Sequence, residues 1–247
     1  QVLKFLQKEK FSSNAMKSSG LFVETKKGYI DRFRKRVIFP IHNHLGKVIA
    51  FAGRAFETNK HAKYVNSPET IIYNKSRVLY GLHASKQAIR KNDYAIIVEG
   101  YFDFLQLFQS GIQNCIAVSG TAFTEYHAIQ LKRYCNSGYI AYDGDAAGKA
   151  AAIRAGYVLL QAGLSPYIIN IPEGIDPDDW IKREGNEPFI QAINNSQTLL
   201  KFHHDNYSGN IKNTAGKTAF INETLTEIAL IKDPITRELY AQKISDL

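Results

Sequence analysis

Carboxylate side chains follow three apolar runs of the chain, in positions that suit metal chemistry. The five acids, each just beyond such a run, are Glu99, Asp143, Asp145, Asp176 and Asp178. In an open sheet of parallel strands, ligands bind beyond the carboxyl ends of the strands, so these acids are expected at one edge. Carboxylates brought together repel one another unless a cation neutralises them, and Mg²⁺ combines one or two carboxylates with substrate phosphates. The sequence therefore predicts Mg²⁺ beside a phosphate chain, with Mn²⁺ as an effective substitute.

Two of these acids also have a structural explanation that involves no metal. Asp145 precedes an expected helix and Asp176 precedes Pro177, and both positions are typical of helix N-caps. Capping does not explain Glu99 or Asp143, which follow expected strands directly. Phosphohydrolases that form an aspartyl-phosphate also place Asp-x-Asp after a strand. Because those enzymes do not need Glu99 as a separate element, metal binding by the whole set is the favoured interpretation.

Helices and strands are expected to alternate through the centre of the chain. The expected strands are 95–98, 115–118, 139–142 and 166–171, and the expected helices are 82–90, 101–111, one from about 124, and 146–162. This order predicts an α/β fold with a doubly wound parallel sheet. A hairpin over 37–52 precedes the sheet, and the chain after 176 has a helical pattern throughout. We expect a mixed, basic N-terminal subdomain over 1–80, a metal-binding domain over 81–185 and a helical subdomain over 186–247.

The net charge of +8 is distributed unevenly along the 247 residues. Residues 17–91 contain sixteen Lys and Arg against four Asp and Glu, whereas residues 92–247 contain twelve against eighteen, so the two parts carry about +12 and −6. A basic surface followed by an acidic site is expected of an enzyme that holds a polyanion and acts on it with metal. The alternative is a solvated basic face that has no partner.

The basic part of the chain also has the residue types of a nucleic-acid surface. Arg32, Arg34 and Arg36 alternate through a stretch that enters the first strand of the hairpin, so they are expected on one face, where guanidinium groups suit phosphate contacts. The segment from Lys63 to Asn66 adds charge, a stacking surface at Tyr64 and an amide, a combination typical of single-strand binding. Lys75 extends this segment. Core packing is the alternative role for Tyr64.

Several motifs together resemble a known family. The segments EGYFD (99–103), DGDAAG (143–148) and DPD (176–178) are similar to the signature of Toprim domains, which occur in primases, topoisomerases and some nucleases. The segments DRFRKRVIFPI (31–41), AGR (52–54), KYVNSPET (63–70), LYG (79–81) and SGT (119–121) resemble bacterial replicative DNA primases of the DnaG type. The resemblance extends from about residue 20 to about residue 190. One departure is Ala146-Ala147, where relatives often carry a basic residue.

This resemblance implies the catalytic core of a DNA primase, a DNA-directed RNA polymerase that makes short RNA primers on single-stranded DNA from ribonucleoside triphosphates. It implies a central Toprim fold between a mixed N-terminal subdomain and a C-terminal helical bundle. Glu99, Asp143 and Asp145 would be the principal catalytic and Mg²⁺-binding acids, Asp176 and Asp178 would complete the metal site, and Asp103 would support it or serve only as a cap. The residues implied to line the groove for template and nucleotide are Arg32, Arg34, Arg36, Arg54, Lys63, Tyr64, Asn66 and Lys75.

The resemblance also implies partners and further domains. With only two cysteines, the chain is not expected to contain the zinc-binding domain that such primases carry upstream. We likewise expect the downstream domain that contacts the replicative helicase to be missing, and the chain to be a fragment. A cytoplasmic, bacterial protein located at replication forks in the nucleoid, without membrane segments, is expected. The remaining alternatives are a Toprim-containing topoisomerase or nuclease and a DNA-binding Toprim module without catalytic activity.

Overall fold

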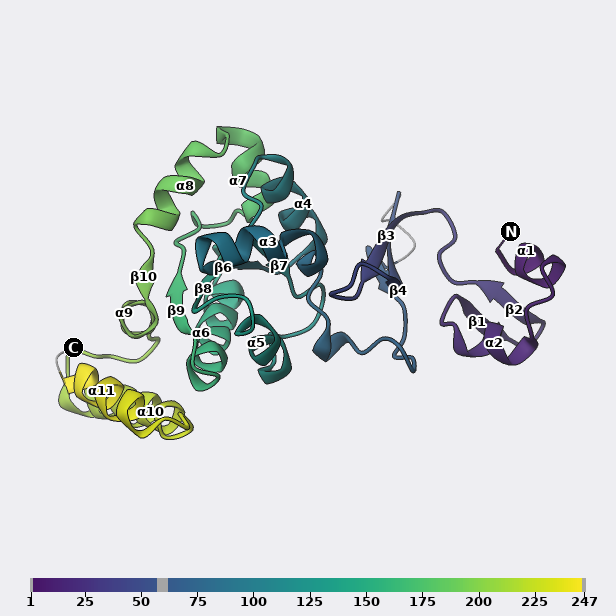
Figure 1. The fold of residues 1–247 in the computed structure, drawn as a ribbon. Coiled ribbons are helices and arrows are strands. Elements are labelled where there is room, and N and C mark those ends of the chain that lie inside the picture. Colours follow the sequence, from purple (N-terminus) through teal and green to yellow (C-terminus); the bar gives the residue numbers. More distant parts are fainter. Residues whose placement is uncertain (1, 57–61, 246–247) are drawn as a thin grey trace. The chain divides into compact units, whose positions relative to one another are not determined.

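The computed structural model describes residues 2–56 and 62–245. The chain divides into two compact units, Gln1–Val78 and Leu79–Leu247. Figure 1 shows the ribbon of both units, with most helices and strands labelled. Each unit has its own sheet structure, and the predicted metal acids all belong to the second. The boundary predicted near residue 185 within that second unit stays a prediction.

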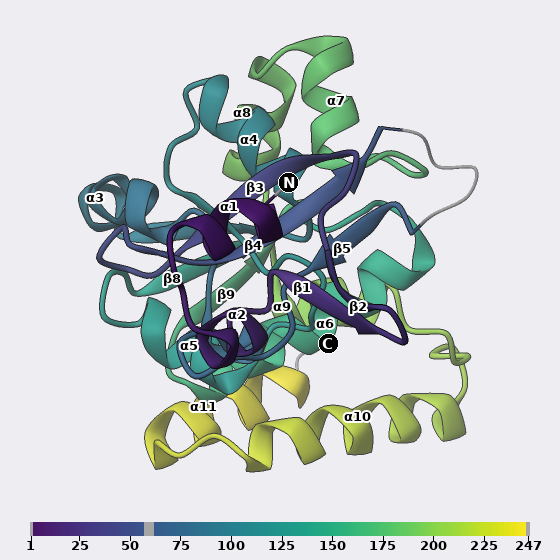
Figure 2. The ribbon, with the colours of Figure 1, turned by 90° about the vertical axis from the view of Figure 1, so that its right-hand side faces the viewer.

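The first unit consists of short helices and two antiparallel sheets. Its elements are α1 (Val2–Lys8), α2 (Ser13–Ser18), β1 (Phe22–Thr25), β2 (Gly28–Asp31), β3 (Arg36–His42), β4 (Val48–Ala55), β5 (Tyr64–Asn66) and the 3₁₀ helix η1 (Lys75–Arg77). β1 pairs with β2, and the second sheet has the order β3-β4-β5 (Figure 2). The predicted hairpin is present as β3 and β4. Its turn is closed by Asn43, whose Oδ1 accepts hydrogen bonds from the backbone N–H groups of Leu45 and Lys47, both at 3.0 Å.

The stretch before β3 differs from the prediction. Residues 32–35 form a turn between β2 and β3, and the strand begins only at Arg36. Lys35 has φ 53°, in the left-handed region that a strand does not contain. The predicted alternation of Arg32, Arg34 and Arg36 on one face of a strand was therefore wrong, because residues 32–35 form a turn where the strand was expected.

The second unit alternates helices and strands and then becomes mainly helical. Its elements are α3 (Leu82–Asn92), β6 (Tyr94–Val98), α4 (Tyr101–Gln109), β7 (Cys115–Ala117), α5 (Glu125–Leu131), β8 (Ser137–Ile140), α6 (Ala146–Gln161), β9 (Ser165–Ile168), α7 (Pro177–Glu184), α8 (Glu187–Asn194), β10 (Gln197–Thr198), α9 (Leu199–Asp205), α10 (Thr214–Ala229) and α11 (Pro234–Ser245). The α/β part agrees with the predicted fold class. β10 is the exception in the segment predicted to be all-helical.

The sheet of the second unit has the order β10-β9-β8-β6-β7, and β6 to β9 are parallel. β10 is antiparallel and pairs with the edge strand β9 through only two residues, too few to leave a pattern in the sequence. α3 and α4 cover one face of the sheet and α5 and α6 the other (Figure 1). Covered on both faces, residues 95–98 of β6 are completely buried. The central strands are thus fixed rigidly, and so are the positions at which they end.

The C-terminal helices share the core of this sheet. Ile228 at the end of α10, Ile231 in the following turn and Ile244 on α11 belong to the same buried cluster as Ile97 and Ile140 of the central strands. α10 and α11 pack against each other, as Figure 2 shows. Because burial of each such side chain stabilises the fold by about 1.5–3 kcal/mol, these helices are an integral part of the second unit.

Candidate metal centre and nucleic-acid surface

Glu99 and Asp143 lie at the point where the strand order of the sheet reverses. β6 is connected through α4 to β7 on one side, whereas β8, which pairs with the other side of β6, is connected through α6 to β9. A crevice beyond the carboxyl ends of the strands opens at such a point. Glu99 directly follows β6, Asp143 follows β8 by three residues, and the backbone N–H of Asp143 donates a hydrogen bond to the Glu99 carboxylate. The topology therefore brings these two acids together.

Two glycines allow the chain around Asp143 to fold tightly. A Cβ at position 144 would lie 2.1 Å from the carbonyl oxygen of Pro172, and one at 148 would lie 2.2 Å from the carbonyl oxygen of Asp143. Only glycine permits such close backbone approaches. Asp145 caps α6, because its Oδ1 accepts a 2.7 Å hydrogen bond from the backbone N–H of Gly148, while its side chain stays exposed. The capping role considered for Asp145 is present in the structure, and it leaves the carboxylate accessible.

The third acidic segment opens α7. Asp176 is the N-cap residue of this helix, accepting a 2.7 Å hydrogen bond from the backbone N–H of Asp179, with Pro177 at the first helical position. Asp176, Asp178 and Asp179 each place one carboxylate oxygen within 4.8 Å of the others. Asp178 is buried, with 8% of its surface exposed. Its Oδ2 pairs with Lys182 Nζ at 2.5 Å, and its Oδ1 has no hydrogen-bond partner among the described residues.

Asp103 joins the first and third acidic segments. It lies in the first turn of α4, where its Oδ2 accepts a 2.9 Å hydrogen bond from the backbone N–H of Gly100. Its Oδ1 accepts a 3.2 Å bond from the backbone N–H of Asp178 on α7. Burial, together with the nearby charge of Asp176, raises the pKa of Asp103 to about 6. Asp103 is thus a buried connecting residue as well as a cap.

Several negative charges lie close together at this edge of the sheet. Burial raises the pKa of Glu99, as do the charges of Asp103 and Asp145, although the hydrogen bond from Asp143 and the charge of Arg154 oppose the increase. Glu99 Oε1 is buried and has no hydrogen-bond partner within the described part of the chain. Unpartnered carboxylate oxygens at Glu99 and Asp178 are hard ligands of the kind that divalent cations prefer. The donor set therefore suits a divalent cation.

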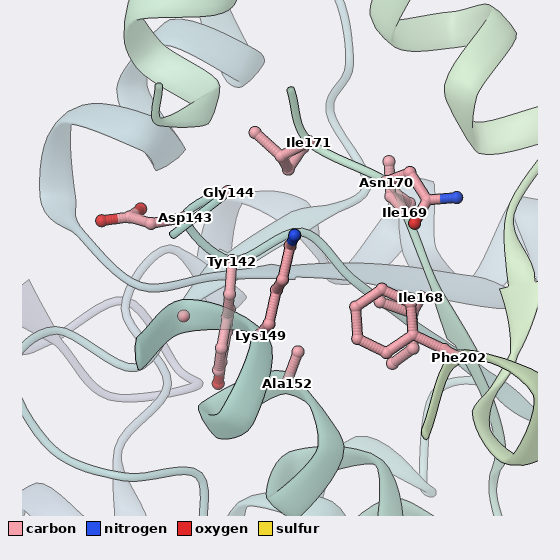
Figure 3. A pocket seen from close by; sticks show the side chains of 11 residues that line it. Tyr142, Asp143, Gly144, Lys149, Ala152, Ile168, Ile169, Asn170, Ile171 and Phe202 are labelled. Atoms are coloured by element: carbon pink, nitrogen blue, oxygen red, sulfur yellow. The ribbon is translucent and has the colours of Figure 1, made fainter. Parts of the chain in front are cut away.

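A small cavity behind the Asp143 turn is not part of this acidic edge. It measures about 20 Å³ and lies beside α6 and the chain that follows β9. Figure 3 shows Lys149 extending from α6 toward Ile169 and Asn170, whereas the carboxylate of Asp143 points away from the cavity. The cavity holds little more than one water molecule, so it is too small for a nucleotide.

In the first unit, three of the predicted nucleic-acid residues share one face of a sheet. Arg54 of β4 pairs with Tyr64 of β5, and Ala52 pairs with Asn66 two positions along the same strands. Side chains two residues apart in a strand point to the same face. The Arg54 guanidinium lies 5.9 Å from the centre of the Tyr64 ring, and the Lys63 ammonium lies 6.0 Å from it. Half-buried Tyr64 thus carries two cations at its ring, an arrangement that suits stacking and phosphate contact.

The other residues predicted to contact nucleic acid are not part of the arrangement around the Tyr64 ring. Arg36 lies on the opposite face of that sheet, and its Nη1 donates to the carbonyl oxygens of Gly53 at 3.0 Å and Ala62 at 2.9 Å. Arg32 Nε donates to the carbonyl oxygen of Gly20 at 3.0 Å. Both guanidinium groups bond the backbone of their own unit. Arg34 is exposed in the turn before β3, and Lys75 is half-buried in η1.

Two residues at the acidic edge were not predicted from the sequence. Asp179 belongs to the Asp176–Asp178 cluster, and Lys182 pairs with Asp178. The spacing of four residues between Asp178 and Lys182 on an expected helix was the available signal, because side chains at i and i+4 meet on one helix face.

Comparison with known proteins identifies the family. Residues 1–86 match the family model of the N-terminal domain of the DNA primase catalytic core, residues 96–181 match the Toprim-like model, and residues 208–247 match the DnaB-helicase binding domain of primase. A DNA primase of Listeria monocytogenes is 37% identical over 250 residues, covering 99% of this chain and 40% of the relative. A solved DnaG primase catalytic domain bound to single-stranded DNA is 32% identical with a TM-score of 0.82, covering 95% of this chain and 77% of that one. This chain belongs to the DNA primase family.

A second solved primase structure, of a longer chain, is similar to this chain to the same degree. The crystal structure of the zinc-binding and RNA polymerase domains of Aquifex aeolicus primase is 35% identical with a TM-score of 0.82, covering 94% of this chain and 57% of that one. The chain spans 40% of the length of the curated Listeria relative. The expectation that the helicase-interacting segment is missing was wrong, because the match over 208–247 includes α10 and α11.

Among the described residues, none of the helices has the length and apolarity needed to cross a membrane.

Proposed function

We propose that this chain synthesises short RNA primers on single-stranded DNA, as a DNA-directed RNA polymerase that acts in replication. The observation that carries the proposal is the meeting of Glu99, Asp143 and the cluster at Asp178 at one edge of the sheet. One carboxylate oxygen of Glu99 and one of Asp178 are buried and have no hydrogen-bond partner among the described residues. The single-stranded DNA in the related DnaG structure supports the template, and the RNA polymerase domain of the Aquifex relative supports the reaction.

The acids have distinct parts in this proposal. Glu99, Asp143 and Asp145 would hold Mg²⁺, and Asp176 and Asp178 would complete the site. A divalent cation held by these residues would supply Lewis-acid chemistry at the primer 3′-hydroxyl and positive charge at the triphosphate. The raised pKa of Glu99, and its Oε1 atom without a hydrogen-bond partner among the described residues, also suit this residue to accept the proton of that hydroxyl.

The rest of the chain keeps these carboxylates in place. Asp103 holds the backbones of Gly100 and Asp178, and thereby fixes the start of α4 relative to the start of α7. The hydrogen bond from Gly148 N–H fixes one oxygen of Asp145. Rigid placement of this kind lowers the barrier to phosphoryl transfer, which depends mainly on positioning and charge.

We further propose that the face of the first unit that carries Arg54, Tyr64 and Asn66 binds the template strand or the incoming ribonucleoside triphosphate. Lys63, Lys75 and Arg34 add positive charge to that unit. Arg36 supports this sheet from its opposite face through its bond to the Gly53 carbonyl oxygen, and Arg32 bonds the Gly20 carbonyl oxygen within the same unit. The cation pair at the Tyr64 ring supports this assignment.

The partners follow from the family match. We propose that α10 and α11 contribute to contact with the replicative helicase, which the match over 208–247 supports. A zinc-binding domain supplied from outside residues 1–247 would assist template selection, as the domain composition of the Aquifex relative suggests. The working place in this proposal is the bacterial cytoplasm, at replication forks in the nucleoid.

The test is ribonucleotide incorporation on a single-stranded DNA template with Mg²⁺ or Mn²⁺. Glu99→Gln is compared with wild type and with Glu238→Gln, which removes an equal charge from an exposed position on α11. We expect short RNA products from wild type and Glu238→Gln, and a loss of about 100-fold or more in Glu99→Gln. Equal product from Glu99→Gln, or no product from the wild-type chain with either metal, would overturn the proposal.

A further inference from the structure

Lys182 forms a close ion pair with the most buried acid of the α7 cluster. Its Nζ lies 2.5 Å from Oδ2 of Asp178, one helical turn earlier. The side chain of Asp178 is 12% exposed and that of Lys182 is 48% exposed. The pair thus joins a carboxylate that faces the acidic edge to an ammonium group that extends from it into solvent.

The ammonium group has a second contact at the same edge. Lys182 Nζ lies 5.9 Å from the centre of the Phe102 ring, and Phe102 is the third residue after Glu99. A lysine over an aromatic face is held by the charge distribution of the ring. Lys182 therefore lies between two of the segments that supply acids, one on α4 and one on α7.

Asp178 requires a positive charge. Asp176 and Asp179 place carboxylate oxygens within 4.8 Å of it, and its own Oδ1 has no partner in the described ranges. A buried carboxylate without a counter-charge is costly, by several kcal/mol for a fully buried ion. In the chain as folded without metal, Lys182 provides that counter-charge.

We propose that Lys182 is a built-in counter-cation of the acidic site, which occupies Asp178 until a divalent cation displaces it. This inference rests on the proposed metal site. Metal binding at Asp178 and the Lys182 pair compete for the same carboxylate, so the pair weakens metal affinity in the free protein. Once displaced, the half-exposed ammonium group stays at the same edge, where it can contact the triphosphate of the incoming nucleotide as a flexible point charge.

The neighbouring pair on the same helix supplies a matched control. Arg183 Nη2 lies 3.4 Å from Oδ2 of Asp179, with the same spacing of four residues, but both side chains are more exposed, at 62% and 48%. Loss of either cation changes the net charge equally and removes one ion pair from α7. The variants therefore differ in whether the released carboxylate is the buried Asp178 or the exposed Asp179.

The experiment measures binding of Mn²⁺ alone to the chain, by the electron paramagnetic resonance signal of free Mn²⁺ and by calorimetry at constant ionic strength. We expect Lys182→Met and Lys182→Gln to lower the apparent Kd by about three- to tenfold, because a partly buried carboxylate is released. We expect Arg183→Met to change it by less than about twofold, the effect of an exposed pair. Circular dichroism verifies that each variant is folded, and the Gln variant replaces Met if the latter is not.

Each result decides the inference. Tighter binding in the Lys182 variants than in Arg183→Met supports displacement. Binding in both Lys182 variants that equals that of Arg183→Met, or is weaker, overturns it and assigns Lys182 to holding Asp178 in place. Asp178→Asn separates this failure from failure of the metal site. If that variant binds Mn²⁺ like wild type, no metal reaches Asp178, and the inference is overturned together with that part of the proposed function.

Discussion

The Asp103 carboxylate accepts a hydrogen bond from the backbone N–H of Asp178, at 3.2 Å, although the two residues are 75 positions apart. Its second oxygen accepts from Gly100, directly after Glu99. One buried side chain thus connects the strand-end acid of β6 with the acids that open α7. The geometry of the metal site therefore depends on a residue that need not touch the metal.

Asp103→Asn tests this connection. An asparagine side chain has one oxygen and one NH₂ group, so either the Gly100 or the Asp178 N–H group loses its acceptor. A buried donor left without an acceptor costs about 1–3 kcal/mol. We expect urea unfolding to show a loss of this size, and Mn²⁺ affinity to fall as α7 moves. Glu187→Gln, at an exposed position in the first turn of α8, is the control. Unchanged stability and Mn²⁺ affinity in Asp103→Asn would contradict the connecting role.

Gly144→Ala tests the close packing of the Asp143 turn. The added Cβ would meet the carbonyl oxygen of Pro172 at 2.1 Å, and backbone atoms cannot rotate away as a side chain can. We expect a destabilisation of about 1–3 kcal/mol from overpacking, together with reduced Mn²⁺ binding and primer synthesis, because the turn that carries Asp143 must shift. Ala147→Ser, exposed in the first turn of α6, should leave all three measurements unchanged. A Gly144→Ala variant that resembles the Ala147→Ser variant would show that the turn has room.

The positions of Glu99 and Asp143 could be predicted because each is the first acid after an apolar run that forms a strand. In a parallel sheet covered on both faces, strands are continuous apolar runs, so the first acid after a run marks the carboxyl edge. Glu99 and Asp143 needed only this rule. Whether Glu99 and Asp143 meet at one crevice depends on the order of the strands in the sheet. The alternation of helices and strands predicts the fold class but not that order.

The arginines could not be assigned in the same way. The spacing of Arg32, Arg34 and Arg36 in the sequence is compatible with a strand and with a turn. The left-handed φ of Lys35 shows that the chain forms a turn here. The roles of Arg32 and Arg36 as donors to backbone carbonyls depend on segments far along the chain, such as Ala62 for Arg36. Long-range contacts of this kind leave no local pattern in a single sequence.

Arg34→Ala and Arg36→Ala should therefore differ. Arg36→Ala removes donors to the carbonyl oxygens of Gly53, Ala62 and Lys63, and we expect it to lower stability by about 1–2 kcal/mol, measured by urea unfolding. Arg34→Ala, exposed in the turn, should keep its stability. In the proposed binding surface it should instead weaken single-stranded DNA binding and reduce the salt slope by about 0.7, the share of one phosphate contact. If Arg34→Ala lowered stability and Arg36→Ala weakened DNA binding instead, Arg36 would belong to the nucleic-acid surface and Arg34 would have a structural role.

His203 of α9 gives the second unit a titratable group in its core, remote from the predicted metal acids in sequence. The residue is 4% exposed, and its Nδ1 lies 2.8 Å from the Tyr157 hydroxyl of α6. From α10, Glu223 Oε1 lies 3.6 Å from Nε2, and the charge of Glu227 also acts on the ring. Burial lowers the pKa of His203 below 6.5, and Glu223 only partly offsets this effect. The neutral ring is therefore the form that the folded chain favours.

The pH dependence of unfolding should reveal this histidine. As pH falls through about 6.5, the unfolded chain takes up a proton at His203 before the folded chain does, so the free energy of unfolding decreases, by at most about 1.4 kcal/mol per pH unit. This contribution is fully present above pH 6.5 and is lost as the pH falls toward the lowered pKa of the folded state. His203→Gln loses stability at every pH because its bond to Tyr157 changes, but its unfolding free energy should depend less on pH between 7.5 and 5.5. His204→Gln, on the same helix and less buried, should keep the slope of the wild-type chain. Urea unfolding at several pH values measures the three slopes, and parallel lines for wild type and His203→Gln would mean that another group titrates.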